Sequence, residues 1–166
     1  MKQILTIAGS DSGGGAGIQA DIKSIHANGG FAMSVITSVT AQNTCEVTGA
    51  FDLPIEIIEA QIDAVFSDFE VSAVKTGMLS SAKIVQVVAK KLHQYSPTKI
   101  VVDPVMVSKS GFPLLQESAI ETIISNLIPL ATVLTPNVHE AQLLSGMKIQ
   151  NVKEAKVAAE KIHQLG

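Results

Sequence analysis

The chain has 166 residues, of which 46% are hydrophobic, so it fits one ordinary domain with a sizeable core. The net charge of −3 without a basic stripe argues against a nucleic-acid partner, and the single Cys45 cannot form an internal disulfide. No apolar run approaches the roughly 20 residues that span a bilayer, and the N-terminus lacks a secretion signal, so we expect a cytoplasmic protein.

Short apolar runs alternate with helical patterns along the chain. The expected strands cover residues 4–8, 31–41, 47–51, 71–75, 99–102 and 132–134. The expected helices begin near Ile18, Pro54 and Ser80, with Ser80 as a cap, and then cover about 119–127, 137–145 and 151–165. This order predicts an α/β fold with a mostly parallel central sheet flanked by helices on both faces. It also predicts a further strand after residue 166, which would leave the sheet incomplete at its C-terminal side.

Polar groups or glycine follow five of the expected strands. These exits are residues 9–15, 42–44, 76–78, 103–106 and 135–137. In open parallel sheets, ligands bind at the carboxyl ends of the strands, because the loops converge there. Polar anchors between apolar walls such as Met78 and Val105 suit a small, flat, partly polar ligand.

The glycine-rich segment after the first strand has several interpretations. It is not a Walker loop, because no Gly-Lys-Ser/Thr follows, and it could be a simple tight turn. Residues 15–20 match the G-x-G-x-x-A dinucleotide fingerprint, but that fingerprint also requires an acidic residue at the end of the second strand. No acid lies between Asp21 and Glu46, which disfavours a dinucleotide.

Several polar residues have both a structural and a functional interpretation. Asp21 is either a charge near a helix N-terminus or a group that faces the ligand. Asn137 and Glu140 have the spacing of a capping box, which spacing alone favours, and they could also organise a hydrated Mg²⁺ near phosphates. Asp103 either shapes a turn with the following proline or anchors a cation.

Five motifs in this order resemble those of the hydroxymethylpyrimidine and phosphomethylpyrimidine kinases of thiamine biosynthesis, which belong to the ribokinase-like superfamily. The motifs are IAGSDSGGGAGIQAD at 7–21, TAQNT at 40–44, KTGML at 75–79, VDPVM at 102–106 and TPNVHE at 135–140. The resemblance covers essentially the whole chain.

The resemblance implies a substrate pocket at the strand exits. In it, Gln42 pairs its amide with the aminopyrimidine edge, which agrees with the donor and acceptor that a glutamine carries. Met78 and Val105 sandwich the ring, the backbone of Gly9 lies near the hydroxymethyl group, and Asp21 faces the same pocket. Related pyridoxal kinases typically lack this glutamine, so Gln42 favours the pyrimidine.

The resemblance also implies the reaction and its cofactors, ATP and Mg²⁺. Asp103, Asn137 and Glu140 are expected to lie toward Mg²⁺ and the ATP phosphates. For Asn137 and Glu140, this implication of the resemblance outweighs the capping interpretation. The γ-phosphoryl group of ATP passes to the substrate hydroxyl, and a second transfer follows onto the monophosphate. Such transfer depends mainly on positioning and charge neutralisation. A homodimer is expected for the full-length protein.

Members of this family continue beyond the position of Gly166, to an adenine site and a Gly-Thr-Gly loop that forms the anion hole. We therefore expect residues 1–166 to be the N-terminal substrate-binding part of a single ribokinase-like domain, inactive alone, with the catalytic residues outside it. Two alternatives stay open: a non-catalytic pyrimidine-binding module and a kinase of pyridoxal type.

Overall fold

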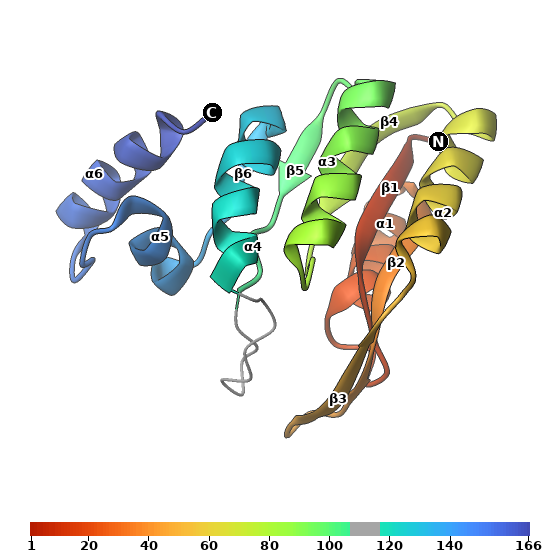
Figure 1. The fold of residues 1–166 in the computed structure, drawn as a ribbon, viewed down its shortest axis with the longest axis horizontal. Coiled ribbons are helices and arrows are strands. Elements are labelled where there is room, and N and C mark those ends of the chain that lie inside the picture. Colours follow the sequence, from red (N-terminus) through yellow and green to blue (C-terminus); the bar gives the residue numbers. More distant parts are fainter. Residues whose placement is uncertain (107–116) are drawn as a thin grey trace.

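One sheet forms the centre of the molecule, with strand order β3-β2-β1-β4-β5-β6 (Figure 1). The structure is a computed structural model that describes residues 1–106 and 117–166. The strands are β1 (Gln3–Asp11), β2 (Phe31–Gln42), β3 (Val47–Asp52), β4 (Val71–Thr76), β5 (Ile100–Val102) and β6 (Val133–Leu134). Neighbouring strands pair in parallel except for β2 with β3, which confirms the predicted mostly parallel sheet.

The helices follow the strands in the predicted order. They are α1 (Gly17–Ala27), α2 (Ile55–Asp68), α3 (Ala82–Tyr95), α4 (Glu117–Thr122), α5 (Val138–Ser145) and α6 (Val152–His163). After α4 the chain continues as a π-helical segment, Ile123–Leu127, and a 3-10 turn, Ile128–Leu130. In the two described ranges, no helix combines the length and apolarity needed to cross a membrane.

The two faces of the sheet are covered by different helices. Leu5 and Val74 are fully buried and belong to the core that α2 and α3 complete. Because side chains alternate along a strand, Thr6 and Lys75 point to the opposite face, where both contact Asp21 of α1. Figure 1 shows α2, α3 and α4 together in front of the strands and α1 behind them. Helices on both faces are thereby confirmed.

The first strand is longer than expected. It continues past Ala8 to Asp11, with a change of register between Ala8 and Ser10 in its pairing with β2. The extra residue of this β-bulge lies on β2, because Thr37 and Ser38 together lie opposite Gly9.

The prediction that Ser80 caps a helix is wrong. The residue before α3 is Ser81, and its side chain makes no capping hydrogen bond. Ser80 instead donates from Oγ to Asp52 Oδ1 at 2.6 Å, and Ser38 Oγ donates to the same oxygen at 2.7 Å. A hydrogen bond to a carboxylate is stronger than one to a backbone amide, so Ser80 ties α3 to the end of β3.

A three-residue polar contact joins α2 to α3. The Lys91 ammonium lies 2.7 Å from both carboxylate oxygens of Asp63, and the Tyr95 hydroxyl donates to Oδ1 of the same residue at 2.7 Å. The Tyr95 ring also stacks on Phe66, with ring centroids 4.4 Å apart. The hydrogen bond from Lys91, followed by that from Tyr95, lowers the pKa of Asp63 below its ordinary value. The charged carboxylate of Asp63 thus holds both Lys91 and Tyr95 in place.

We predict that Asp63→Asn lowers the stability of the chain near neutral pH. A carboxyl whose pKa is lower in the folded state stabilises that state above its unfolded pKa of about 3.9. This contribution disappears as the pH falls through the folded pKa. Urea unfolding from pH 7 to pH 3 should therefore show a modest loss for the variant at pH 7 that shrinks below about pH 4. A loss that is the same at every pH would contradict the prediction.

We predict that Gly17→Ala destabilises the chain more than Gly29→Ala. Both glycines have positive φ, +56° and +76° respectively, where an alanine costs about 1 kcal/mol. A Cβ on Gly17 would also overlap the carbonyl oxygen of Gly9, whereas one on Gly29 would meet nothing within 4 Å. The free energy of unfolding in urea measures both variants, and equal losses would show that the close approach to Gly9 is unimportant.

Candidate functional site

Parallel pairing brings several predicted substrate residues to one edge of the sheet. Gln42 is the last residue of β2, Met78 follows β4 by two residues, and Val105 follows β5 by three. Gly9 in β1 lies against Met78, because a Cβ on Gly9 would overlap the Met78 methyl group. Met78 is buried and Val105 is half-buried.

The glycine-rich loop after β1 is organised by Asp11, a residue that the sequence did not single out. Its carboxylate accepts hydrogen bonds from the amides of Gly13 at 2.7 Å, Gly15 at 2.9 Å and Ala16 at 2.8 Å. Asp11 is only 5% exposed. In a dinucleotide fold, amides of such a loop would hold a pyrophosphate. Here the protein's own carboxylate engages them, which further disfavours a dinucleotide site. An aspartate directly before a glycine run is typical of such a turn.

The Gln42 side chain is held at its oxygen. Thr40 Oγ1 lies 3.1 Å from Gln42 Oε1 and 3.0 Å from the carbonyl oxygen of Ser10, so its single hydrogen serves one of them at a time. The Gln42 backbone is fixed by Ser12, whose Oγ accepts from its amide at 2.8 Å and donates to its carbonyl at 2.6 Å. Within the described residues, the Gln42 amide NH₂ donates to no protein acceptor. That group is therefore available to a ligand.

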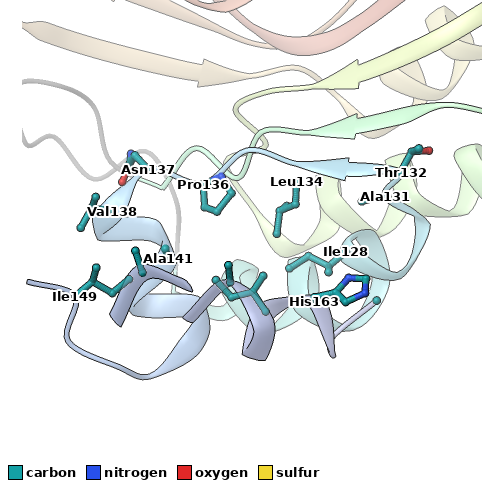
Figure 2. Close-up of a pocket in the computed structure, with 14 residues that line it drawn as sticks. Ile128, Ala131, Thr132, Leu134, Pro136, Asn137, Val138, Ala141, Ile149 and His163 are labelled. Atoms are coloured by element: carbon teal, nitrogen blue, oxygen red, sulfur yellow. The ribbon is translucent and has the colours of Figure 1, made fainter. Parts of the chain in front are cut away.

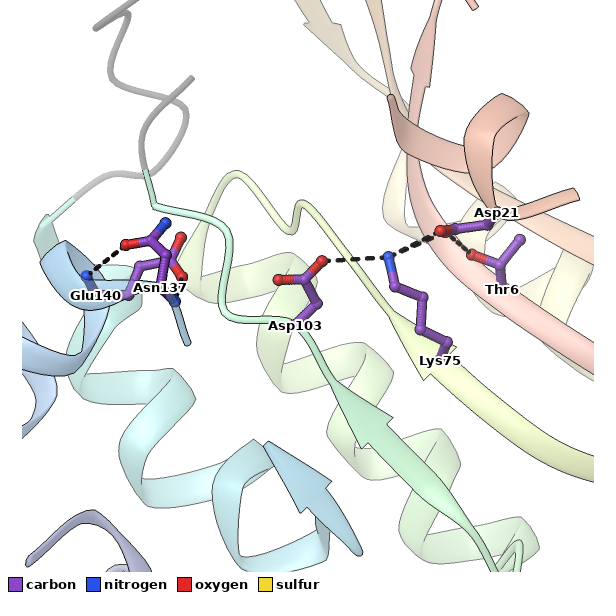
Figure 3. Close-up of polar contacts among 6 residues, drawn as sticks. All are labelled: Thr6, Asp21, Lys75, Asp103, Asn137 and Glu140. Carbon is purple, nitrogen blue, oxygen red and sulfur yellow. Dashed lines mark hydrogen bonds and ion pairs between the residues drawn. The ribbon is translucent and has the colours of Figure 1, made fainter. Parts of the chain in front are cut away.

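Asp21 lies inside α1, beyond its first turn, which contains no acidic residue. The interpretation as a helix N-terminal charge is therefore wrong. Its carboxylate accepts from Thr6 Oγ1 at 2.6 Å and forms an ion pair with Lys75 Nζ at 3.0 Å (Figure 3). The side chain is 14% exposed, and both Thr6 and Lys75 bind its carboxylate.

Lys75 joins Asp21 to Asp103. Its Nζ also lies 3.4 Å from Asp103 Oδ2, and Figure 3 shows the lysine between the two acids. The sequence placed Lys75 in a motif but gave it no role. The available signal was a lysine between Val74 and Thr76 in a buried strand, a place where charged residues are rare unless they are paired.

Asn137 and Glu140 form a capping box at the start of α5. Asn137 Oδ1 accepts from the Glu140 amide at 3.0 Å, and Glu140 Oε2 accepts from the Asn137 amide at 2.8 Å. The capping interpretation is therefore confirmed, and Figure 3 shows the hydrogen bond between Glu140 and the Asn137 side chain. Glu140 Oε1 has no protein donor in the described part of the chain. In residues 1–106 and 117–166, no three His, Cys, Asp or Glu residues form a cluster that could hold a metal ion.

A separate groove of about 490 Å³ lies beside β6, between this strand and helices α5 and α6 (Figure 2). Its lining is mainly apolar and includes Ile128, Leu134 and Ile162; of the predicted site residues, only Asn137 contributes. Among the described strands, β6 pairs with β5 alone. The groove therefore follows the outer strand of the sheet and is distinct from the strand ends that carry Gln42.

Comparison with known proteins gives consistent results. The family model for phosphomethylpyrimidine kinase matches residues 11–166. The chain is 49% identical over its full length to the hydroxymethylpyrimidine/phosphomethylpyrimidine kinase of Bacillus subtilis (strain 168) and covers 61% of that protein. It thus spans about three fifths of the length of this curated relative.

Solved structures show the same fold. The crystal structure of phosphomethylpyrimidine kinase from Clostridium difficile 630 matches with a TM-score of 0.94 and 52% identity, over 100% of this chain and 72% of that one. An ADP complex of Bacillus subtilis pyridoxal kinase matches with a TM-score of 0.90 and 39% identity, over 100% of this chain and 63% of that one. The chain belongs to the hydroxymethylpyrimidine/phosphomethylpyrimidine kinase family of thiamine biosynthesis, whose fold is ribokinase-like.

Proposed function

We propose that this chain is the pyrimidine-binding part of a kinase that phosphorylates 4-amino-5-hydroxymethyl-2-methylpyrimidine and then its monophosphate. The observation that carries the proposal is the Gln42 side chain, whose oxygen lies 3.1 Å from Thr40 Oγ1 while its NH₂ group donates to no acceptor among the described residues. It lies at the same edge of the sheet as Gly9 and Met78. Membership of the kinase family supports the assignment.

The chemistry of an aminopyrimidine matches this edge. The ring presents an amino donor beside a ring-nitrogen acceptor, and a primary amide offers the complementary acceptor and donor. Gln42 Oε1 has two lone pairs, so it can accept from the amino group even when Thr40 donates to it. In this proposal Met78 and Val105 form apolar walls for the flat ring, and the Gly9 backbone, which lies against Met78, is near the hydroxymethyl group.

The remaining acids fit a hydrated magnesium ion bound together with ATP. Mg²⁺ prefers oxygen ligands and usually keeps several waters, so one or two carboxylates and the phosphates are sufficient. Asp103 and Glu140 each have a carboxylate oxygen for this purpose, and Asn137 lies beside Glu140. When bound, the ion neutralises charge on the transferring phosphoryl group. In this proposal Lys75, which is itself paired with Asp21, holds the Asp103 carboxylate toward the substrate.

The relatives are longer than this chain, which supports the expectation that the adenine site and the catalytic residues lie outside residues 1–166. We therefore propose that the 166-residue chain binds the pyrimidine but does not turn over ATP. We also propose that the whole protein is a homodimer, which light scattering would test.

A pyridoxal kinase is the second candidate. It is favoured by the structural match to the pyridoxal kinase of Bacillus subtilis, at 39% identity. Pyridoxal has a phenolic oxygen and an aldehyde in place of the aminopyrimidine edge, so it does not use the donor and acceptor of Gln42 in the same way.

We predict that Gln42→Glu weakens binding of the hydroxymethylpyrimidine to the chain by roughly 100-fold, because the isosteric carboxylate keeps the acceptor but loses the NH₂ donor. Calorimetric titration with the pyrimidine, pyridoxal and NAD measures this effect. Gln86→Glu, which adds the same charge on the exposed face of α3, is the matched control and should bind like wild type.

Unchanged affinity of Gln42→Glu for the pyrimidine would refute the role of Gln42. Tighter binding of pyridoxal than of the pyrimidine by the wild-type chain would favour the second candidate. Turnover of ATP by the 166-residue chain would show that the catalytic residues lie within it.

We further predict that Gly9→Ala weakens pyrimidine binding by about tenfold with little loss of thermal stability. The added Cβ would overlap the methyl end of Met78, which is flexible and can turn away, so the change reshapes the ring wall rather than the backbone. Gly49→Ala in β3 is the control, since its Cβ would meet only Ala41, at 4.0 Å. Equal pyrimidine affinities for the two variants would show that Gly9 is not part of the substrate site.

A further inference from the structure

The ammonium of Lys75 occupies the space between two carboxylates from different elements. Its Nζ lies 3.0 Å from Asp21 Oδ1 on α1 and 3.4 Å from Asp103 Oδ2 after β5. The side chains of Asp21, Lys75 and Asp103 are 14%, 26% and 32% exposed respectively. The three side chains are thus partly shielded from water, and their charges interact more strongly than on a free surface.

The position of the ammonium is also fixed by the backbone. A Cβ built on Gly77 would lie 3.3 Å from Lys75 Nζ, so the cation rests beside the Gly77 main chain, next to the segment that carries Met78. The Thr6 hydroxyl donates to Asp21 Oδ2 and holds that carboxylate toward the lysine. Together these contacts place one positive charge where two carboxylates converge.

A divalent cation would favour the same place. Two carboxylates from separate elements, with water on the open side, form a hard oxygen site with a charge of −2. Lys75 reduces that charge to −1 and takes the position between the oxygens. The ammonium thus lies between the two carboxylates that a divalent cation would have to reach.

We propose that Lys75 is a resident cation that prevents Asp21 and Asp103 from binding a divalent metal ion in the absence of phosphates. This inference rests on the proposed function in one respect, the assignment of Asp103 to the magnesium side. With Lys75 in place, the protein by itself has low affinity for magnesium, and the ion reaches Asp103 together with the triphosphate that carries it. Lys75 is a positioning residue in this scheme, since it contacts the two acids and not the reacting atoms.

A purely structural role for Lys75, as the counter-charge that keeps Asp21 buried, makes a different prediction. Its removal would then lower stability without creating affinity for metal. A resident cation predicts a gain of metal affinity on removal of the charge, whatever the effect on stability.

The experiment measures binding of Mn²⁺ alone, without nucleotide, to the 166-residue chain by electron paramagnetic resonance. We expect Lys75→Met to bind Mn²⁺ at least about tenfold more tightly than wild type, because the two carboxylates regain their full charge. Lys75→Arg keeps the positive charge and should remain as weak as wild type. Adding Asp103→Asn to Lys75→Met should remove the gain.

Three outcomes would overturn the inference: no gain in Lys75→Met, an equal gain in Lys75→Arg, or a gain that persists when Asp103 is replaced. Lys75→Gln is a second test if the Met variant fails to fold, since its amide can still donate to Asp21 while carrying no charge. Circular dichroism confirms folding of each variant. A parallel pyrimidine titration keeps the two proposals separate, because absent pyrimidine binding refutes the proposed function while the Mn²⁺ comparison still decides the role of Lys75.

Discussion

The parallel pairing of β1 with both β2 and β4 determines where everything else in the site lies. Thr6 pairs with Ser34 on one side and with Lys75 on the other, and Asp11 at the end of β1 pairs with Thr40, two residues before Gln42. A shift of one residue in either register would turn Lys75 or Gln42 to the other face of the sheet. The apolar side chains of the opposite face, Leu5 and Val74 among them, oppose such a shift because they would leave the core that α2 and α3 complete.

Local hydrogen bonds then fix the loops and side chains whose approximate positions the strand register determines. Asp11 binds three amides of the glycine-rich loop, so the loop has a defined shape without a bound anion. Gln19 adds to this, since its side chain accepts from the Asp11 amide at 2.8 Å and donates to Ser10 at 2.7 Å. These bonds connect the end of β1 to α1, the helix that carries Asp21. The loop and the Asp21–Lys75 pair are in this way parts of one framework.

The sequence predicted the order of elements and the strand ends well, because hydrophobic periodicity and glycine or proline turns report local structure directly. It placed Gln42 and Met78 at strand ends, and the structure confirms those positions. The partners of side chains were harder to predict. Lys75 is 54 positions from Asp21, and no local pattern reveals such a contact. The prediction of Ser80 as a cap is wrong for the same reason, because its side chain bonds instead to Asp52, a residue of β3 that is distant in the sequence.

The capping box at Asn137 shows a second limit of prediction. Spacing favours the cap and the family resemblance favours a metal role. The structure confirms the cap, while one Glu140 oxygen has no donor among residues 1–106 and 117–166. The two interpretations therefore do not exclude each other, because a carboxylate has two oxygens. The cap fixes the side chain in one orientation, and such preorganisation is useful in a residue that also meets a ligand.

The contact between Tyr95 and Asp63 has an optical consequence. The chain has one tyrosine and no tryptophan, so its near-ultraviolet absorption and emission above the phenylalanine background come from Tyr95 alone. That ring stacks on Phe66, and its hydroxyl donates to a carboxylate, an arrangement that quenches tyrosine emission by proton transfer in the excited state. Separation of α2 from α3 would release the quenching. The chain thus carries a natural fluorescent reporter of the packing between these two helices, with no label required.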